Sequence, residues 1–335
     1  MPREIVGKGL RFSLRHAPCA HICRYCLISE SRKRSALPFS RFEQLVHRFY
    51  DWKQSERRDD FEIGVFVGPS YDYDLDILEG VARLRARRGA KFQILNLGGL
   101  RIRRGDELTA WLDERRAAGI IGFHASLAGC GETHDRWNGR AGDFDYQTSI
   151  LRLGGERGMV RQEKLFLTQN TLPMFDRLLD ILDEIPGEAR SRVASPFFYA
   201  GLAPRYESER ITEDDRDNLP ERINRLRPRK FDNWLSEREW IPIMLETASQ
   251  PRRLLLKLDV DETNIDYLES APCAAIFAER ERQYQESYRG IPALDELCAR
   301  YGDPTNRRIY IMSRDVEGRW LDMHERETGS KAPID

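Results

Sequence analysis

The order of apolar segments is the feature that most constrains the fold of this chain. Up to about Arg205, short segments with strand character alternate with longer segments of helical period. The predicted strands are Leu10 to Leu14, Phe61 to Val67, Lys91 to Leu97, Ile120 to Ser126, Glu163 to Leu167 and Val193 to Tyr199. The predicted helices between them are Arg41 to Trp52, Leu75 to Arg87, Asp106 to Ala118, Tyr146 to Glu156 and Met174 to Ile185. This alternation predicts a parallel sheet with crossover helices.

The number of strands favours an α/β fold of the partial (β/α)6 TIM-like type, and an open doubly wound sheet would show the same alternation. A charge-dense segment begins at Glu207, so we place a soft boundary near Arg205. Residues 1–205 are then the core, and residues 206–335 are a smaller α+β region that closes the barrel and shapes the substrate site. In this region we expect a strand from Arg253 to Val260, a helix from Ala274 to Tyr288 and a strand from Arg307 to Met312, followed by a polar tail.

Charge and composition exclude several classes of protein. The 54 basic and 55 acidic side chains nearly cancel, which removes a general attraction to nucleic acid or to an anionic membrane. Residues 1–11 contain no continuous apolar run, so we expect neither a signal peptide nor a membrane anchor, and a cytoplasmic location. Six cysteines in 335 residues are too few for a secreted disulfide scaffold.

Three of the cysteines, Cys19, Cys23 and Cys26, fall within eight residues and are separated by three and then two residues. A loop of this length can present three thiolates to one metal centre, and thiolates are the ligands of iron-sulfur clusters. Three ligands leave one coordination position open, as in catalytic metal sites. The alternatives are a structural zinc site completed by His21, or reduced thiols without a ligand.

The segment from Cys19 to Cys26, CAHICRYC, resembles the cysteine motif of the radical S-adenosylmethionine (SAM) superfamily, and the resemblance extends over roughly Leu10 to Arg205. It implies one [4Fe-4S] cluster whose open iron binds SAM. It also implies reductive cleavage of SAM to a 5'-deoxyadenosyl radical that abstracts a hydrogen atom from substrate. An external one-electron reductant of the flavodoxin or ferredoxin type would supply the electron. Tyr25 would pack beside the adenine.

A second segment, Ser126 to Arg136 with Gly139 and residues 142–144 after it, resembles the fourth-strand region of peptide-modifying and sulfatase-maturing radical SAM enzymes. The resemblance implies that Ser126 lies near the SAM ribose and that the substrate is a peptide. His134 and Asp135 are expected to cap and order the loop. Ala128 stands where that branch carries an aspartate.

Four more residues are candidate SAM contacts through their positions. Gly68 and Ser70 lie where the family has a Gly-Gly-Glu-Pro turn, although the acidic residue is missing here. Arg161 would meet the SAM carboxylate or face solvent, and Asn170 follows the fifth predicted strand. A simple turn role is the alternative for Gly68, Ser70 and Asn170.

The isolated cysteines limit the chemistry further. Only Cys273 and Cys298 lie in the C-terminal third, too few for a second four-cysteine cluster, so we expect a single cluster. Cys130 and Cys273 are candidate hydrogen donors of the kind that radical SAM epimerases use, or else inert small apolar residues. A small metabolite in place of a peptide, or a non-enzymatic zinc or iron-sulfur module, remains open at this point.

Overall fold

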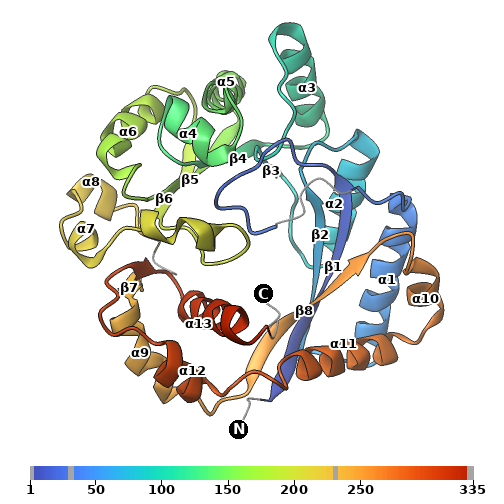
Figure 1. Ribbon diagram of the computed structural model, residues 1–335. Coiled ribbons are helices and arrows are strands. Elements are labelled where there is room, and N and C mark those ends of the chain that lie inside the picture. Colours follow the sequence, from blue (N-terminus) through green and yellow to red (C-terminus); the bar gives the residue numbers. More distant parts are fainter. Residues whose placement is uncertain (1–3, 29–33, 229–232, 330–335) are drawn as a thin grey trace.

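Parallel strands form a curved wall with most helices on its outside (Figure 1). The computed structural model describes residues 4–28, 34–228 and 233–329, so the first three residues of the N-terminal stretch considered above lie outside it. The core strands are β1 (Ile5–Ala17), β2 (Glu62–Pro69), β3 (Ile94–Asn96), β4 (Gly122–Leu127), β5 (Val160–Phe166) and β6 (Ala189–Ser195). Every pairing among them is parallel, which confirms the predicted α/β fold.

The wall consists of two hydrogen-bonded sheets instead of one. Their strand orders are β2-β1-β8 and β3-β4-β5-β6, and no ladder joins β2 to β3 within the described residues. The prediction of a strand from Lys91 to Leu97 was too long, because only Ile94–Asn96 pairs with β4. β6 begins four residues before the predicted Val193, because Ala189 already pairs with Arg161 of β5, and it ends at Ser195 instead of the predicted Tyr199.

The crossover helices agree with the predicted segments to within a few residues. They are α1 (Phe39–Ser55), α2 (Leu75–Ala86), α3 (Gly105–Ala117), α5 (Asp143–Glu156) and α6 (Phe175–Asp183, preceded by the 3-10 turn Leu172–Met174). One more helix, α4 (Gly131–Asn138), lies where we expected only a loop. Its eight residues are mostly polar and give no helical apolar pattern, and its buried face is built from Thr133, His134, Trp137 and Asn138.

The two faces of the wall differ in chemistry. Leu10, Phe12 and Leu14 of β1 are fully buried and face the helices, where the rings of Phe12 and Phe49 lie 4.8 Å apart. Alternate residues point to the inside of the wall and are polar and half-exposed, as with His124 and Ser126 of β4. The apolar core therefore lies between strands and helices, and the inner wall is polar.

The C-terminal region adds a strand to the core sheet. β8 (Arg252–Val260) pairs in parallel with β1, and β7 (Leu235–Ser236) pairs antiparallel with β9 (Ile309–Tyr310). The helices are α7 (Glu213–Asp217), α8 (Glu221–Asn224), α9 (Glu237–Glu246), α10 (Ile265–Ser270), α11 (Cys273–Ser287) and α12 (Leu294–Tyr301), after the 3-10 segment Ala203–Glu209. β8 extends the wall beyond β1, on the side away from β2.

The prediction of a polar tail after Met312 was wrong. Residues Ser313–Thr328 form helix α13, which lies between the β6 side and the β8 side of the wall (Figure 1). Val316, Trp320 and Leu321 recur at helical spacing and are buried, whereas charged residues fill the remaining face and dominate the composition. The helix thus closes part of the opening between β6 and β8.

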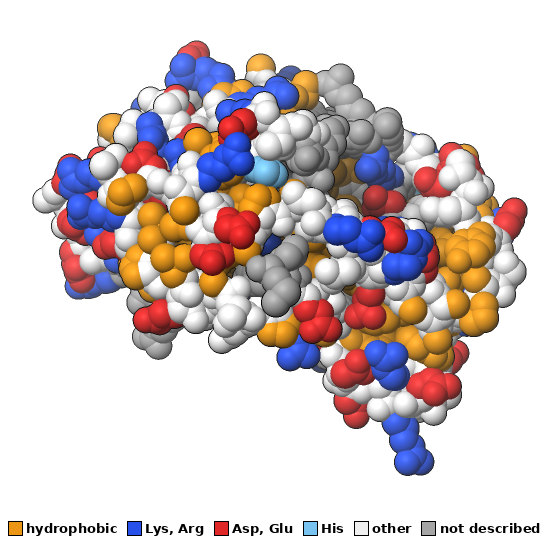
Figure 2. All heavy atoms as spheres, turned by 60° about the horizontal axis from the view of Figure 1, so that its bottom comes forward, with side chains coloured by type: hydrophobic (Ala, Val, Ile, Leu, Met, Phe, Trp, Pro, Cys, Tyr) orange, Lys and Arg blue, Asp and Glu red, His pale blue; other side chains and the backbone are white. Residues whose placement is uncertain are grey.

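The outer surface mixes charges of both signs. Figure 2 shows Lys and Arg side chains beside Asp and Glu side chains on the face drawn there, with no large area of one sign. Many of these charges are paired, as Arg41 is with Glu269 and Arg307 with Asp214. Within the part of the chain that the structure describes, no helix is long and apolar enough to span a membrane.

Candidate functional site

The three clustered cysteines lie on the loop that leaves the carboxyl end of β1. Backbone hydrogen bonds hold this loop: Ala20 donates to Gly99 at 3.1 Å, Ile22 to Asn138 at 3.1 Å and Arg24 to Trp137 at 2.8 Å. The carbonyl of Cys26 also accepts from the amide of Leu202 at 2.9 Å. The loop is therefore fixed to the turn after β3 and to the end of α4. All three cysteines are half-buried and unpaired with one another.

Glycines allow the neighbouring segments to approach this loop closely. A side chain at Gly99 would collide with the sulfur of Cys19, and one at Gly201 would collide with the carbonyl of Cys26. At Gly139, an added Cβ would lie 2.6 Å from the carbonyl oxygen of Ile22. All three glycines have positive φ, a conformation that residues with side chains rarely adopt. Only glycine at these three positions lets the neighbouring segments pack so closely on the loop. We call Gly99, Gly139 and Gly201 the cradle.

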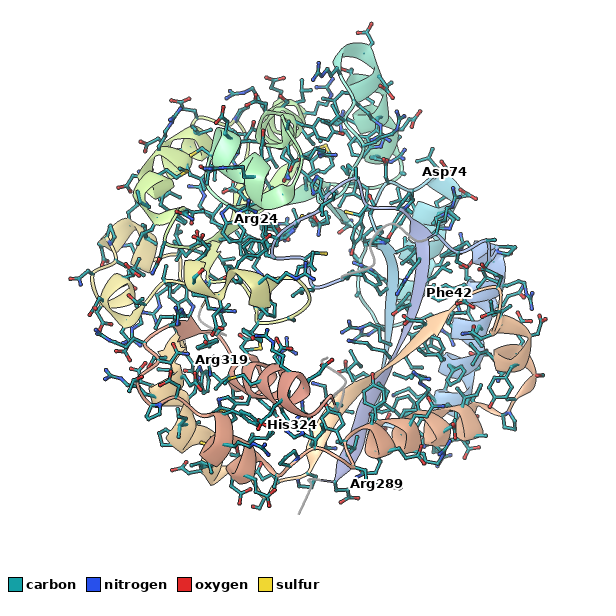
Figure 3. All side chains as sticks on the ribbon, viewed as in Figure 1. Arg24, Phe42, Asp74, Arg289, Arg319 and His324 are labelled. Atoms are coloured by element: carbon teal, nitrogen blue, oxygen red, sulfur yellow. The ribbon has the colours of Figure 1, made fainter. Side chains whose placement is uncertain are left out.

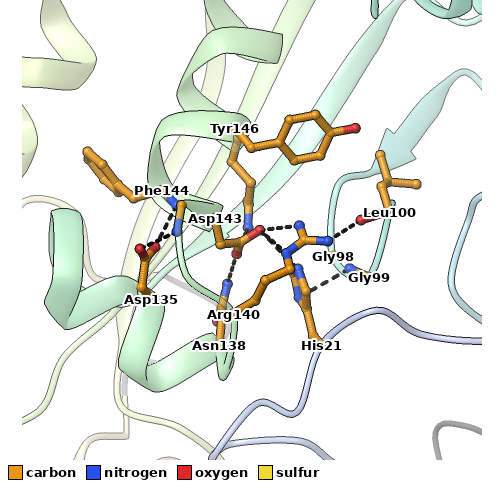
Figure 4. A network of polar contacts seen from close by, with 12 residues as sticks. His21, Gly98, Gly99, Leu100, Asp135, Asn138, Arg140, Asp143, Phe144 and Tyr146 are labelled. Atoms are coloured by element: carbon orange, nitrogen blue, oxygen red, sulfur yellow. Dashed lines mark hydrogen bonds and ion pairs between the residues drawn. The ribbon is translucent and has the colours of Figure 1, made fainter. Parts of the chain in front are cut away.

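His21, between the first two cysteines, is buried and bonded through both ring nitrogens (Figure 4). Its Nδ1 accepts a hydrogen bond from the Gly99 amide at 3.2 Å. Its Nε2 therefore carries the proton and donates to Asp143 Oδ1 at 3.0 Å. Burial is the main cause that lowers the pKa of His21, so the ring is neutral at pH 7. The histidine ties the cysteine loop to the start of α5.

Asp143 is the centre of this network and is fully buried. Its two carboxylate oxygens accept hydrogen bonds from five side chains: His21, His134, Asn138, Arg140 and Gln147. Burial alone would raise the pKa of Asp143, but the bonds from His134 and His21 hold it well below its usual range. The carboxylate stays ionised because so many donors converge on it.

The same network orders the loop after β4, as expected for His134 and Asp135. His134 Nδ1 accepts from the amide of Ala128 at 3.1 Å, in the turn where the aspartate is missing. Asp135 accepts from the amides of Gly142 and Phe144 at 2.6 and 2.9 Å, which caps the start of α5. These two side chains are structural.

Aromatic residues pack against Tyr25 of the cysteine loop. Tyr25 packs against Phe166 with ring centroids 4.3 Å apart, and its hydroxyl donates to Asn138. The ring centroids of Trp137 and Tyr25 lie 6.3 Å apart in a stacked arrangement. The guanidinium of Arg24, a residue labelled in Figure 3, lies 5.9 Å from the centre of the Trp137 ring. Burial raises the pKa of the Tyr25 hydroxyl well above its usual value. Tyr25 therefore has one ring neighbour on β5 and one on α4.

Burial affects the protonation of the three clustered thiols. Burial is the main cause that raises the pKa of Cys19, Cys23 and Cys26, so they remain protonated at pH 7 unless positive charge lies among them. An iron-sulfur cluster would supply that charge. No three His, Cys, Asp or Glu side chains among the described residues are arranged to hold a single metal ion. His21, with both nitrogens engaged, is not placed as the fourth ligand of a zinc site.

Ser70 lies beside the cysteine loop, and its groups are already bonded. Its hydroxyl donates to the Gly99 carbonyl at 2.9 Å, and its amide donates to Ala17 at 3.2 Å. Gly68 is buried within β2 and not in a tight turn, because the strand continues to Pro69. Ser70 thus joins the ends of β1, β2 and β3.

Ser126 lies on the inner wall, where its partner across the ladder is Lys164 of β5. Arg161 lies on the opposite face of β5, and its guanidinium donates to Glu163 and to the carbonyls of residues 182 and 185–187. Because these hydrogen bonds hold the side chain of Arg161 on the helix side of the sheet, the expectation that it meets the SAM carboxylate or faces solvent was wrong. Asn170 is exposed and donates to Glu209, which does not bring it to the cysteines.

The two candidate hydrogen donors lie in the outer layer. Cys273 begins α11, is buried behind β1 and β8, and accepts from Arg48 of α1 at 3.2 Å. Cys130 is buried at the start of α4 against Met174. Both belong to the apolar core between strands and helices. The structure therefore does not bring either thiol to the inner wall.

Sequence reasoning missed the residues that hold the loop. His21 was considered only as a zinc ligand, and Asn138, Arg140 and Asp143 were not considered as site residues. The sequence signals for Asp143 are its place in the resembling segment of residues 142–144 and its position directly after Gly142, a pattern typical of a helix start. Nothing in the spacing indicates that Asp143 meets a histidine 122 residues earlier.

Comparison with known proteins gives fold neighbours only. No protein-family model and no curated protein matches this chain. Among solved structures, Streptococcus suis SuiB bound to precursor peptide SuiA matches with a TM-score of 0.42 and 11% identity, over 79% of this chain and 52% of SuiB. Escherichia coli coproporphyrinogen III oxidase (HemN), described as a radical SAM enzyme, matches with a TM-score of 0.37 and 14% identity, over 74% of this chain and 54% of HemN.

The protein anSMEcpe with bound AdoMet matches with a TM-score of 0.46 and 12% identity, over 95% of this chain and 97% of anSMEcpe. This chain spans about half the length of SuiB and HemN. Because these identities and TM-scores are low, function must be argued from the residues of the chain itself.

Proposed function

We propose that this chain is a radical SAM enzyme with a single [4Fe-4S] cluster on Cys19, Cys23 and Cys26. The observation that carries the proposal is the position of these thiols. They lie on one loop at the carboxyl end of β1, where sites form in barrels of parallel strands. Bound there, the cluster and SAM would supply a 5'-deoxyadenosyl radical for hydrogen abstraction.

The residues of the chain position and shield this chemistry. The cradle of Gly99, Gly139 and Gly201 fixes the backbone of the loop, and the bond from His21 to Asp143 fixes its orientation. We propose that Tyr25 of the cysteine loop contacts the adenine of SAM. Ser126 of the inner wall would contact the ribose. Gly68 and Ser70 remain candidates for the same cofactor, because Ser70 bonds to Gly99 next to the loop.

The substrate that we propose is a peptide, and an external flavodoxin or ferredoxin would supply the electron. The segment from Ser126 to Arg136 supports this choice through its resemblance to the peptide-modifying branch. Residues 206–335 are proposed to close the barrel and to shape the substrate site, since β8 and α13 lie on its open side (Figure 1). Failure of every candidate precursor peptide to bind would favour a small metabolite.

The test is anaerobic reconstitution with iron and sulfide. We expect a brown protein with about four irons that releases 5'-deoxyadenosine from SAM and a reductant. Cys23→Ala should lose the iron, whereas Cys298→Ala on α12 should keep it. A colourless protein with one tightly bound zinc would end the proposal.

A further inference from the structure

The inner wall of β4 and β5 carries polar side chains whose hydrogen-bonding groups are not used within the described residues. His124 and Ser126 of β4 lie beside Gln162 and Lys164 of β5 in the ladder. All four are half-exposed, although the residues between them are buried. Burial lowers the pKa of His124 to about 4, with Lys164 adding to the shift, so this ring is neutral at pH 7. Lys164 is therefore the charged member of the group.

The ammonium of Lys164 is held by aromatic rings. It lies 4.9 Å from the centre of the Phe166 ring and 4.7 Å from that of Phe198. Among the described residues it makes neither a hydrogen bond nor an ion pair, so its three donors remain available. Burial lowers its pKa to about 8, and the charge of Asp315 opposes that shift, so the group is largely protonated at pH 7.

A second cation reaches the same ring from the C-terminal region. The guanidinium of Arg314, on the first turn of α13, lies 5.7 Å from the centre of the Phe198 ring. Arg314 is exposed and forms no hydrogen bond or ion pair with any described residue. Two positive groups, one from β5 and one from α13, therefore lie against the ring of Phe198.

The neighbouring acid does not neutralise this pair. Asp315 is buried, and its carboxylate accepts hydrogen bonds from the amides of Tyr199 and Met312 at 3.1 and 3.3 Å. Burial raises the pKa of Asp315, and the charge of the nearby Arg210 opposes that shift. One acid therefore faces three cations, which leaves the surroundings of Phe198 positive.

We propose that Lys164 and Arg314, which both lie against the ring of Phe198, form a binding site for an anionic group of the substrate, a carboxylate or a phosphate. The assignment to substrate rests on the proposed function. Lys164 contacts Phe166, and Phe166 contacts Tyr25 of the cysteine loop, so the anion would be held within two ring contacts of that loop. Arg314 belongs to α13, so the core and the C-terminal region would clamp the anion together.

The experiment uses the full chain without its cluster. Reductive methylation with carbon-13 formaldehyde labels its eight lysines and keeps their charge. The Lys164 resonance is assigned by its loss in Lys164→Arg, and exposed Lys91, assigned in the same way, is the control. We expect inorganic phosphate and acetate to shift the Lys164 resonance at concentrations that leave Lys91 unmoved. Arg314→Gln should weaken this binding by about tenfold.

Three outcomes would overturn the site. The first is a Lys164 resonance that moves only together with Lys91, and the second is unchanged binding in Arg314→Gln. The third is competition by SAM for phosphate in the reconstituted protein, which would assign the cation pair to the SAM carboxylate and not to substrate. The iron content of the reconstituted protein is measured separately, so loss of the cluster proposal is distinguishable from loss of the anion site.

Discussion

The loop of Cys19, Cys23 and Cys26 and the surroundings of Cys273 show two ways of holding a thiol. The loop is held by backbone hydrogen bonds, close contacts at glycine and one buried carboxylate. Cys273 is held in the apolar layer between α1, α11 and the sheet, with Arg48 as its polar neighbour.

This difference predicts how each region responds to a single substitution. Apolar packing is spread over many side chains, so one substitution removes a small share of it. A polar network in a buried site depends on every partner, because a donor left without an acceptor keeps the full cost of desolvation. We therefore expect the cysteine loop to fail abruptly and the outer layer to weaken gradually.

The largest effect is expected for Asp143→Ala. It removes the acceptor of four buried donors and of the half-buried Arg140, and should lower the free energy of unfolding by about 3–5 kcal/mol. Iron retention after reconstitution should fall with it. Asp145→Ala, an exposed change in the same helical turn, is the control and should cost about 0.5 kcal/mol. Equal urea midpoints for the two variants would contradict a central role of Asp143.

Gly99→Ala tests whether the close approach of Gly99 to Cys19 requires a glycine. Gly89 and Gly99 both have positive φ, at 69° and 80°, but only Gly99 faces another residue, Cys19. The strain common to both sites should cost about 1 kcal/mol in Gly89→Ala, and the collision should bring the cost in Gly99→Ala to about 3 kcal/mol. Urea unfolding measures both, and iron content should fall only in Gly99→Ala. If the costs are the same, close approach at Cys19 is not what the glycine provides.

His124, on the inner wall, should make the free energy of unfolding depend on pH. Its folded pKa of about 4 lies below the unfolded value of 6.5, so the unfolded chain binds the proton first as the pH falls. Stability from this group is present above pH 6.5 and should drop by about 2 kcal/mol between pH 6.5 and pH 5. His124→Gln should flatten the profile of unfolding free energy over this range. A variant profile as steep as that of the wild type would assign the slope to other groups.

The smallest effect is expected for Cys273→Ala. The change removes one sulfur from the outer layer, and Arg48 keeps its carbonyl acceptors in Glu269 and Ala271. The cost should be about 1 kcal/mol in urea unfolding, with the iron content unchanged. Loss of iron in this variant would break the distinction between the two regions.

Much of the core fold was predictable because it is encoded locally. The apolar periods gave the order of strands and helices, and the spacing of the cysteines gave the candidate ligands. Helices α4 and α13 were missed, because their buried faces are narrow and their composition is mostly polar. Arg161 was expected to meet the SAM carboxylate or to face solvent, but it is buried on the helix side of β5. Alternation along a strand defines two faces and does not say which one faces the helices.

The sequence by itself determined a parallel α/β chain with three thiols on its first strand-end loop, because both properties depend on spacing along the chain. Only the tertiary structure decided that Asp143 accepts a hydrogen bond from His21 and that Gly99 lies against Cys19. The same holds for the approach of Lys164 and Arg314 to the ring of Phe198. These pairs are brought together by strand register and by the packing of helices on the sheet. Such contacts join residues far apart in the chain, and no local pattern records them.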